Sequence, residues 1–355
     1  MHPLIDNAER ALAEGDAGRA VALAGRALSG GAPRLAAWHI VSDGLATVLR
    51  RTGLLGPGFQ RGALRPSELR ENPSNWPSAW AVRDLVEELQ RALHALVQEG
   101  ETRAAQQIFE LGEAVSEIEC DRAPPNGSPS GRVVSLLCCE RPELLDRTLA
   151  DLLASDLPAS DLVLFEDASR DPGVLDRLRQ LDGGAHRLHL LVNRGFSSRS
   201  WAGNHNVVLD YVERELAGFE TLILLDTDMA LARDWWSCTQ SLYRALRDRQ
   251  LSEGRLGVIT AFHAEPSHPT LRTIHCDGVA ARIKTTVGGC QLVVPRETYL
   301  DALGPFDHLA DWGWCARLRA AGRYAACVVP SRAQHLGDDS LLFHCVHDHA
   351  GDFLR

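Results

Sequence analysis

The chain has 355 residues, of which 45% are hydrophobic and 24% are charged, and its net charge is -10 with histidine neutral. This length fits two domains better than one, and the negative charge disfavours a nucleic-acid backbone or an anionic membrane as the main partner. No apolar run approaches the ~20 residues that span a bilayer, and the N-terminus lacks a secretory signal pattern. Nine scattered cysteines without a Cys-x-x-Cys pair are typical of reduced thiols, so we expect a cytoplasmic protein.

Residues 1–120 show helical periodicity in almost every segment. Small residues recur in "AERALAEGDAGRAVALAGRALSGGAP", and similar spacing returns in "VQEGETRAAQQIFELGEAV". Small side chains at such intervals let two antiparallel helices approach closely, so this region resembles tetratricopeptide-type helix pairs. We predict an all-α, tetratricopeptide-like domain over 1–120 that offers a surface for oligomerisation. A generic helical bundle is the alternative interpretation.

The composition changes at 121–131, where Pro, Gly and Ser dominate, and this stretch is predicted to be a linker. Beyond it, apolar runs alternate with amphipathic helical segments. Near-continuous apolar strands separated by helices predict an α/β domain with a mostly parallel sheet covered by helices on both faces, over 132–340. Residues 341–355 are left as a C-terminal tail. The expected strands are 132–139, 161–167, 186–193, 221–228 and 255–262.

The expected strands end in polar residues, and ligands of such sheets bind beyond the carboxyl ends of the strands. The first strand runs into Glu140, whereas the second ends in Asp167, the third in Asn193 and the fourth in Asp226-Thr227-Asp228. An acidic strand end can accept hydrogen bonds from a ribose diol or a uracil N–H. Two carboxylates one residue apart repel each other unless a cation lies between them. Because Mg²⁺ and Mn²⁺ are usually held by carboxylates and phosphates together, Asp226 and Asp228 are candidates for a metal–diphosphate site. A polar turn after the strand is the alternative interpretation.

The order of these motifs resembles that of the GT-A glycosyltransferases, and most closely the large family 2 of inverting enzymes. The resemblance covers about residues 133–337 and implies a Rossmann-like GT-A fold. It also implies metal-dependent transfer of a sugar, of the hexosyltransferase type, from a nucleotide-diphospho-sugar, with a UDP-sugar as the expected donor. The blocks that carry it are "CCERPELLDRTL", "EDASRD", "NRGFSSRSWAGNHNVV", "LDTD", "GGCQLVVPRETYLDALGPFD", "DWGWCARLRAAG" and "HLG".

The resemblance implies a role for each motif residue. Asp311 falls at the position of the catalytic base, which takes the acceptor's proton in a direct displacement. A bound Mn²⁺ or Mg²⁺ would stabilise the departing diphosphate. The implied donor-nucleotide residues are Glu140, Asp167, Asn193 and Asp226; the implied metal ligands are Asp226, Asp228 and His335; and the implied acceptor or sugar contacts are Gly288, Gly289 and Trp312.

Several alternatives stay open. The family often places further acids beside the base, whereas here Asp311 is flanked by Ala310 and Trp312. Inversion of the configuration at the anomeric carbon is the expected outcome of the transfer, and retention is the alternative. A tetratricopeptide-like region suggests a protein or peptide acceptor, and a saccharide acceptor is the alternative. The competing functions are a sugar nucleotidyltransferase, which usually has a Gly-rich loop after its first strand, and an inactive binding scaffold. The histidine-containing tail over 341–355 is interpreted as a lid, a metal site or an inert end.

Overall fold

The computed structural model describes only part of the N-terminal half. There the predicted helical domain is represented by α1 (Pro3–Ala13), an amphipathic helix that buries Ile5, Ala8 and Ala11. Most of the rest of that domain, the middle of the linker and residues 341–349 of the tail lie outside the described residues. In the part that is described, no helix is long and apolar enough to cross a membrane. The described residues are 3–16, 20, 23, 118–124, 129–138, 141–167, 169, 171–193, 201–263, 268–307, 309–337 and 350–354.

The chain divides into two compact units. One comprises Met1–Ile118 with Asn193–Gly203, and the other comprises Glu119–Val192 with Asn204–Arg355. The second unit contains nearly all of the α/β region and nearly all of the predicted site residues. The first strand of the region, β1 (Ile118–Arg122), begins before the predicted linker and includes the first two linker residues.

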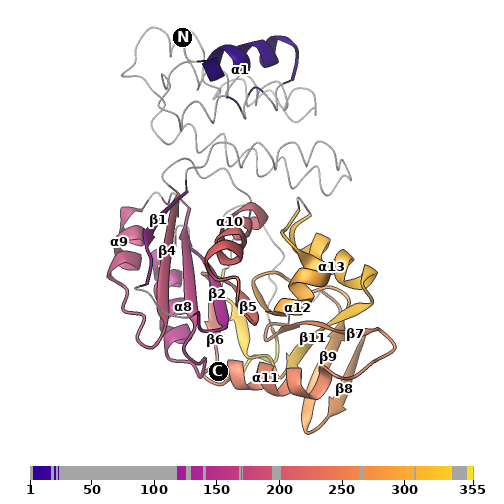
Figure 1. Ribbon diagram of the computed structural model, residues 1–355. Helices are drawn as coiled ribbons and strands as arrows, with labels where there is room; N and C mark the ends of the chain where they lie inside the picture. The colour runs from indigo at the N-terminus through magenta and orange to yellow at the C-terminus, as the bar shows by residue number, and fades with distance from the viewer. Residues whose placement is uncertain are drawn as a thin grey trace. The chain divides into compact units, whose positions relative to one another are not determined.

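A ten-stranded sheet organises the α/β region (Figure 1), with the strand order β1-β4-β3-β2-β5-β10-β7-β11-β9-β8. The pairs β2–β3, β3–β4 and β2–β5 are parallel, so the predicted parallel α/β sheet is confirmed there. Beyond β5 the sheet becomes mixed, because β10 runs antiparallel to both β5 and β7. The remaining bounds are β2 (Arg132–Cys138), β3 (Asp161–Glu166), β4 (Arg187–Asn193), β5 (Thr221–Asp226), β7 (Arg255–Thr260), β8 (Arg272–Cys276), β9 (Val279–Lys284), β10 (Gln291–Pro295) and β11 (Arg323–Val329).

Helices cover both faces of the sheet, as predicted. Successive side chains of a strand point to opposite faces. Val134 and Leu136 of β2 face the hydrophobic cluster that holds α8, α9 and α11, whereas Ser135 between them contacts His205 of α10. The helices are α8 (Pro142–Leu153), α9 (Pro172–Gln180), α10 (Trp201–Glu215), α11 (Trp235–Leu246), α12 (Arg296–Thr298), the π-helical turn Tyr299–Leu303 and α13 (Ala310–Ala320).

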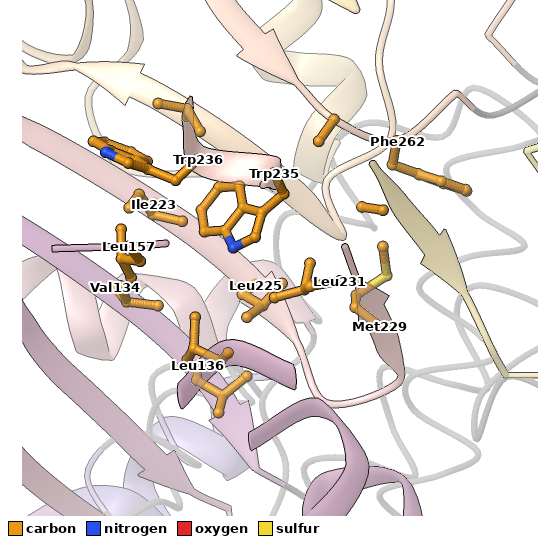
Figure 2. Close-up of a cluster of buried hydrophobic side chains, with 14 of the residues drawn as sticks. Val134, Leu136, Leu157, Ile223, Leu225, Met229, Leu231, Trp235, Trp236 and Phe262 are labelled. Carbon is orange, nitrogen blue, oxygen red and sulfur yellow. The ribbon is translucent and has the colours of Figure 1, made fainter. Parts of the chain in front are cut away.

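The main hydrophobic cluster holds the strand ends in place. Figure 2 shows Trp235 of α11 beside Leu225 of β5, with Leu231 nearby. Each of these three residues is at most 2% exposed. Because Leu225 directly precedes Asp226, this packing fixes the point at which β5 emerges from the core.

A small second sheet lies next to the end of β5. It consists of β6 (Met229–Leu231) and β12 (Ala333–His335), which are antiparallel and pair His335 with Met229. The Leu336 N–H also donates to the Asp228 carbonyl at 2.7 Å. The late histidine is thereby brought beside the Asp-x-Asp turn, although the two are far apart in sequence.

The buried hydroxyl of Thr148 on α8 fixes this turn from the other side. Its Oγ1 lies 2.6 Å from the Thr227 carbonyl oxygen and 2.8 Å from that of Met229. It also accepts the Met229 N–H at 3.1 Å. A hydroxyl has one proton to donate and two lone pairs to accept with, so this side chain holds the backbone on both sides of Asp228.

We expect Thr148→Val to lower the free energy of unfolding by roughly 1–3 kcal/mol, because it leaves the buried Met229 N–H and its neighbouring carbonyls without this partner. Thr148→Ser keeps the hydroxyl and should cost less. Urea denaturation of both variants beside the wild type measures the difference. Equal stability of the Val and Ser variants would contradict the role given to the hydroxyl.

Candidate active site

The predicted strand ends meet at one edge of the sheet. In the parallel register, Leu137 of β2 pairs with Asp226 of β5, and Cys138 pairs with Glu166 of β3. Asp167 follows β3 directly, and Asn193 is the buried last residue of β4. Glu140 lies outside the described residues. Asp167 and Asp226 therefore lie at the same edge of the sheet, and Asn193 ends β4, the neighbour of β3.

Asp228 lies between an arginine and a histidine side chain. Its Oδ2 is 3.0 Å from Arg141 Nη1 and 3.2 Å from His335 Nε2. Burial on its own would raise the pKa of Asp228, but the hydrogen bond from His335 and the positive charges of His335 and Arg141 lower it below its ordinary value. Conversely, burial opposes protonation of His335, and its hydrogen bond to Asp228, with the charges of Asp228 and Asp226, raises its pKa. Arg141 and His335 therefore favour the ionised form of the Asp228 carboxylate.

Gly337 lets the backbone pass close to this cluster. A Cβ at this position would lie 2.5 Å from Asp228 Oδ2 and 3.0 Å from Arg141 Nη1. Atoms cannot approach that closely, so any side chain here would displace the carboxylate or the guanidinium. The glycine of the His-x-Gly motif therefore has a steric role at the site.

Asp226 is backed by a buried histidine that was not among the predicted site residues. His205 Nε2 lies 3.7 Å from Asp226 Oδ1, and His205 Nδ1 lies 3.1 Å from Ser135 Oγ. Burial lowers the pKa of His205 and outweighs the opposite effect of Asp226, so the ring is neutral. When the Ser135 hydroxyl donates to Nδ1, the proton of the neutral ring is on Nε2, which faces Asp226. A single histidine within a helical segment gives no sequence pattern by which it could have been found.

Three motif blocks meet at Asp167. Its Oδ2 accepts a hydrogen bond from Asn204 Nδ2 at 2.9 Å, and its own N–H donates to the Cys138 carbonyl at 3.2 Å. The neighbouring Glu166 accepts the Ser169 N–H at 2.6 Å. Asp167 is buried, so its position is fixed by β2 and α10 together.

Asp311 is held in the first turn of α13 by the double-glycine loop. Its Oδ2 accepts the Gly289 N–H at 3.0 Å. Burial raises the pKa of Asp311 to about 6, against the lowering effect of the hydrogen bonds from Gly289 and Trp312, and the negative charge of Asp226 adds to the rise. The preceding residue, Ala310, has a φ of 54°, which is uncommon for a residue with a side chain. Such strain is typical of functional positions.

Trp312 and His268 form an aromatic wall beside the double-glycine loop. The two ring centroids are 5.1 Å apart with an interplanar angle of 31°, and Trp312 is 48% exposed. A Cβ on Gly288 would lie 3.5 Å from His268 Nε2. His268 is buried and was not predicted as a site residue. An exposed indole with a ring packed against it offers a flat apolar surface of the kind that sugar C–H groups contact.

The three carboxylates of the site converge on Cys290, which directly precedes β10. Burial raises the pKa of the Cys290 thiol, and the negative charges of Asp226, Asp228 and Asp311 raise it further. The Asp226 N–H also donates to the Cys290 carbonyl at 3.0 Å. Asp226, Asp228 and Asp311 therefore lie in the same region of the sheet edge, near Cys290.

The donor atoms suit a hard divalent cation in kind, because carboxylate oxygens and an imidazole are ligands that Mn²⁺ accepts. Among the described residues, no group of three or more His, Cys, Asp and Glu side chains is arranged to hold a metal ion. Asp228 and His335 are in contact, while Asp226 faces His205. Two of the three predicted ligands are thus brought together directly.

No protein-family model matches the chain, and no curated protein matches it. Among solved structures, the mannosyltransferase PcManGT from Pyrobaculum calidifontis, in complex with GDP-Man and Mn²⁺, is similar with 19% identity and a TM-score of 0.40 over 70% of each chain. S. aureus TarS 1-349 is similar with 12% identity and a TM-score of 0.40, over 57% of this chain and 59% of that one. Its complex with UDP-GlcNAc has a TM-score of 0.38. In a longer TarS structure the match spans 36% of the TarS chain.

Proposed function

We propose that this protein is a metal-dependent glycosyltransferase of the hexosyltransferase type. It would move a sugar from a nucleotide-diphospho-sugar, with a UDP-sugar as the expected donor, to a protein, peptide or saccharide acceptor. The observation that carries the proposal is the placement of Asp228 at the end of the parallel sheet, with its Oδ2 3.2 Å from His335 Nε2 and 3.0 Å from Arg141 Nη1.

The donor side of the proposed site consists of the strand ends. Asp167, Asn193 and Asp226, with Glu140, would bind the nucleotide through carboxylate and amide oxygens. Asp226, Asp228 and His335 would hold Mn²⁺ or Mg²⁺. When bound, the cation would supply Lewis-acid stabilisation of the charge that develops on the leaving diphosphate. The protein contributes by fixing Asp228 through Thr148, Gly337 and the β6–β12 pair before the donor arrives.

The acceptor side of the proposed site consists of Asp311, the double glycine and Trp312. Asp311 would take the proton of the acceptor as the acceptor attacks the anomeric carbon, and a direct displacement inverts that centre. A base works best when its pKa lies near the working pH, and the pKa of about 6 for Asp311 meets that requirement. Gly288 and Gly289 would let the backbone approach the donor sugar, and Trp312 would contact the sugar or the acceptor through its exposed face.

A donor screen tests the proposal. The full chain would be melted with UDP-, GDP- and TDP-sugars in the presence of Mn²⁺, and release of the nucleoside diphosphate would be followed in the same mixtures. We expect one nucleotide class to raise the melting temperature by several degrees, because a ligand that binds only the folded state stabilises it. That shift should disappear with EDTA. The absence of any metal-dependent shift or release with all three classes would refute the proposed function.

A further inference from the structure

Arg141 is a site residue to which the proposed chemistry gives no role. It caps α8 in the left-handed conformation, with φ 52° and ψ 57°, and Pro142 follows at the start of the helix. Left-handed backbone is costly for a residue with a Cβ. This turn directs the guanidinium to Asp228, where Nη1 lies 3.0 Å from Oδ2 with 20% of the Arg141 side chain exposed.

Asp228 Oδ2 has a second neighbour, since His335 Nε2 is 3.2 Å away. Only the histidine can become neutral near physiological pH; an arginine stays charged. A divalent cation bound to Asp228 would therefore lie close to the permanent positive charge of Arg141. Two positive charges a few ångströms apart repel each other measurably, even at an effective dielectric constant of about 20.

We propose that Arg141 is a resident counter-ion of Asp228 that opposes metal binding while the donor site is empty and binds the donor's diphosphate once the metal is present. This inference rests on the proposed function. The diphosphate and Asp228 would share the same cation, so the guanidinium that reaches Asp228 also reaches the diphosphate. The planar guanidinium fork matches phosphate oxygens well. Metal and nucleotide would then bind cooperatively, and the metal would be held firmly only when a donor is there.

The proposal requires two effects of opposite sign from one substitution. In Arg141→Gln, Mn²⁺ without nucleotide should bind roughly threefold to tenfold more tightly, because the opposing charge is gone. With saturating Mn²⁺, the affinity for UDP or GDP, whichever the wild type binds, should fall on the order of tenfold, because a charge-assisted hydrogen bond is lost. A residue that only supported the fold would weaken both affinities.

The test is a titration of the full chain with Mn²⁺ followed by electron paramagnetic resonance, first alone and then with UDP or GDP. The matched control is Arg177→Gln, which removes an exposed arginine paired with Asp146 at 3.2 Å and should leave both affinities unchanged. Arg141→Lys serves if the Gln variant does not fold; it keeps the charge, so Mn²⁺ affinity should stay near the wild-type value while nucleotide affinity still falls.

Two negative results are distinguishable. Suppose that the wild type binds Mn²⁺ in the presence of UDP or GDP. If Arg141→Gln then binds Mn²⁺ alone no more tightly than the wild type does, the counter-ion inference is overturned and the proposed function stands. If Arg141→Lys is the variant that folds, wild-type nucleotide affinity in it overturns the inference. A wild type that retains no Mn²⁺ with UDP, GDP or TDP overturns the proposed function together with the inference.

Discussion

Asp228→Asn is expected to lower the transfer rate by a factor on the order of 10²–10³, because it removes the negative charge that would hold the cation at the leaving diphosphate. The amide has nearly the shape of the carboxylate, so the fold should survive. It has no negative charge, however, to balance Arg141 and His335, which lie 3.0 Å and 3.2 Å from Asp228 Oδ2. Mn²⁺ binding followed by electron paramagnetic resonance should be lost together with the transfer rate.

The control for this prediction is Asp146→Asn. Asp146 is also a carboxylate paired with an arginine, Arg177, but 55% of its side chain is exposed on α8. Exposed ion pairs contribute little, so this variant should keep wild-type activity and Mn²⁺ affinity. More than a tenth of the wild-type rate in Asp228→Asn, with the control unaffected, would exclude Asp228 as a metal ligand.

The sheet and its polar edge could be predicted from the sequence because both depend on local patterns. Strands buried on both faces are nearly continuous apolar runs, and the runs that end at Glu166 and Asp226 are of this kind. The parallel register of β2, β3 and β5 then brings their ends together. Among the strands that were missed, β8 and β9 consist largely of exposed and half-buried residues near one edge of the sheet, where the apolar signal is weak.

The partners of the site residues could not be predicted, because they depend on tertiary contacts. Arg141 lies within one of the motif blocks, but nothing in the sequence indicates that a left-handed turn directs it to Asp228. Thr148 resembles any buried threonine of an amphipathic helix, and His205 resembles any core histidine. His335 was placed by resemblance to a family; the physical reason, its pairing with Met229 across β6 and β12, is visible only in the fold.

Asp311→Asn is expected to lower the transfer rate by about 10²–10⁴-fold, the usual contribution of a general base. Only the ionised carboxylate can take the acceptor's proton, and burial raises the pKa of Asp311 to about 6. The wild-type rate under subsaturating substrates should therefore increase as the pH rises through about 6 and become constant above about 7. A rate that is independent of pH between about 5 and 8, or a variant with more than a tenth of the wild-type rate, would contradict the assignment.

The same substitution should make the protein more stable at neutral pH. The pKa of Asp311 is higher in the folded chain than the ordinary value of 3.8, so the folded state favours the protonated form. Its contribution to stability is fully present below about pH 4 and is lost as the pH rises through about 6. Asparagine is neutral at every pH and its side-chain oxygen can still accept the Gly289 N–H. The free energy of unfolding of Asp311→Asn should therefore exceed that of the wild type by an amount on the order of 1–3 kcal/mol at about pH 7.5, and the gain should shrink towards about pH 4.5.

Urea denaturation across this pH range measures that difference, with Asp307→Asn as the comparison, because Asp307 is a partly exposed carboxylate in the loop before α13, paired with Arg317. A gain in stability that appears only in Asp311→Asn, and only above about pH 6, would indicate that ionisation of this carboxylate lowers the free energy of unfolding. Natural proteins tolerate such a cost where function depends on it. A loss of more than about 1 kcal/mol at neutral pH would instead mean that the charge on Asp311 holds the double-glycine loop to α13, and that its role is structural.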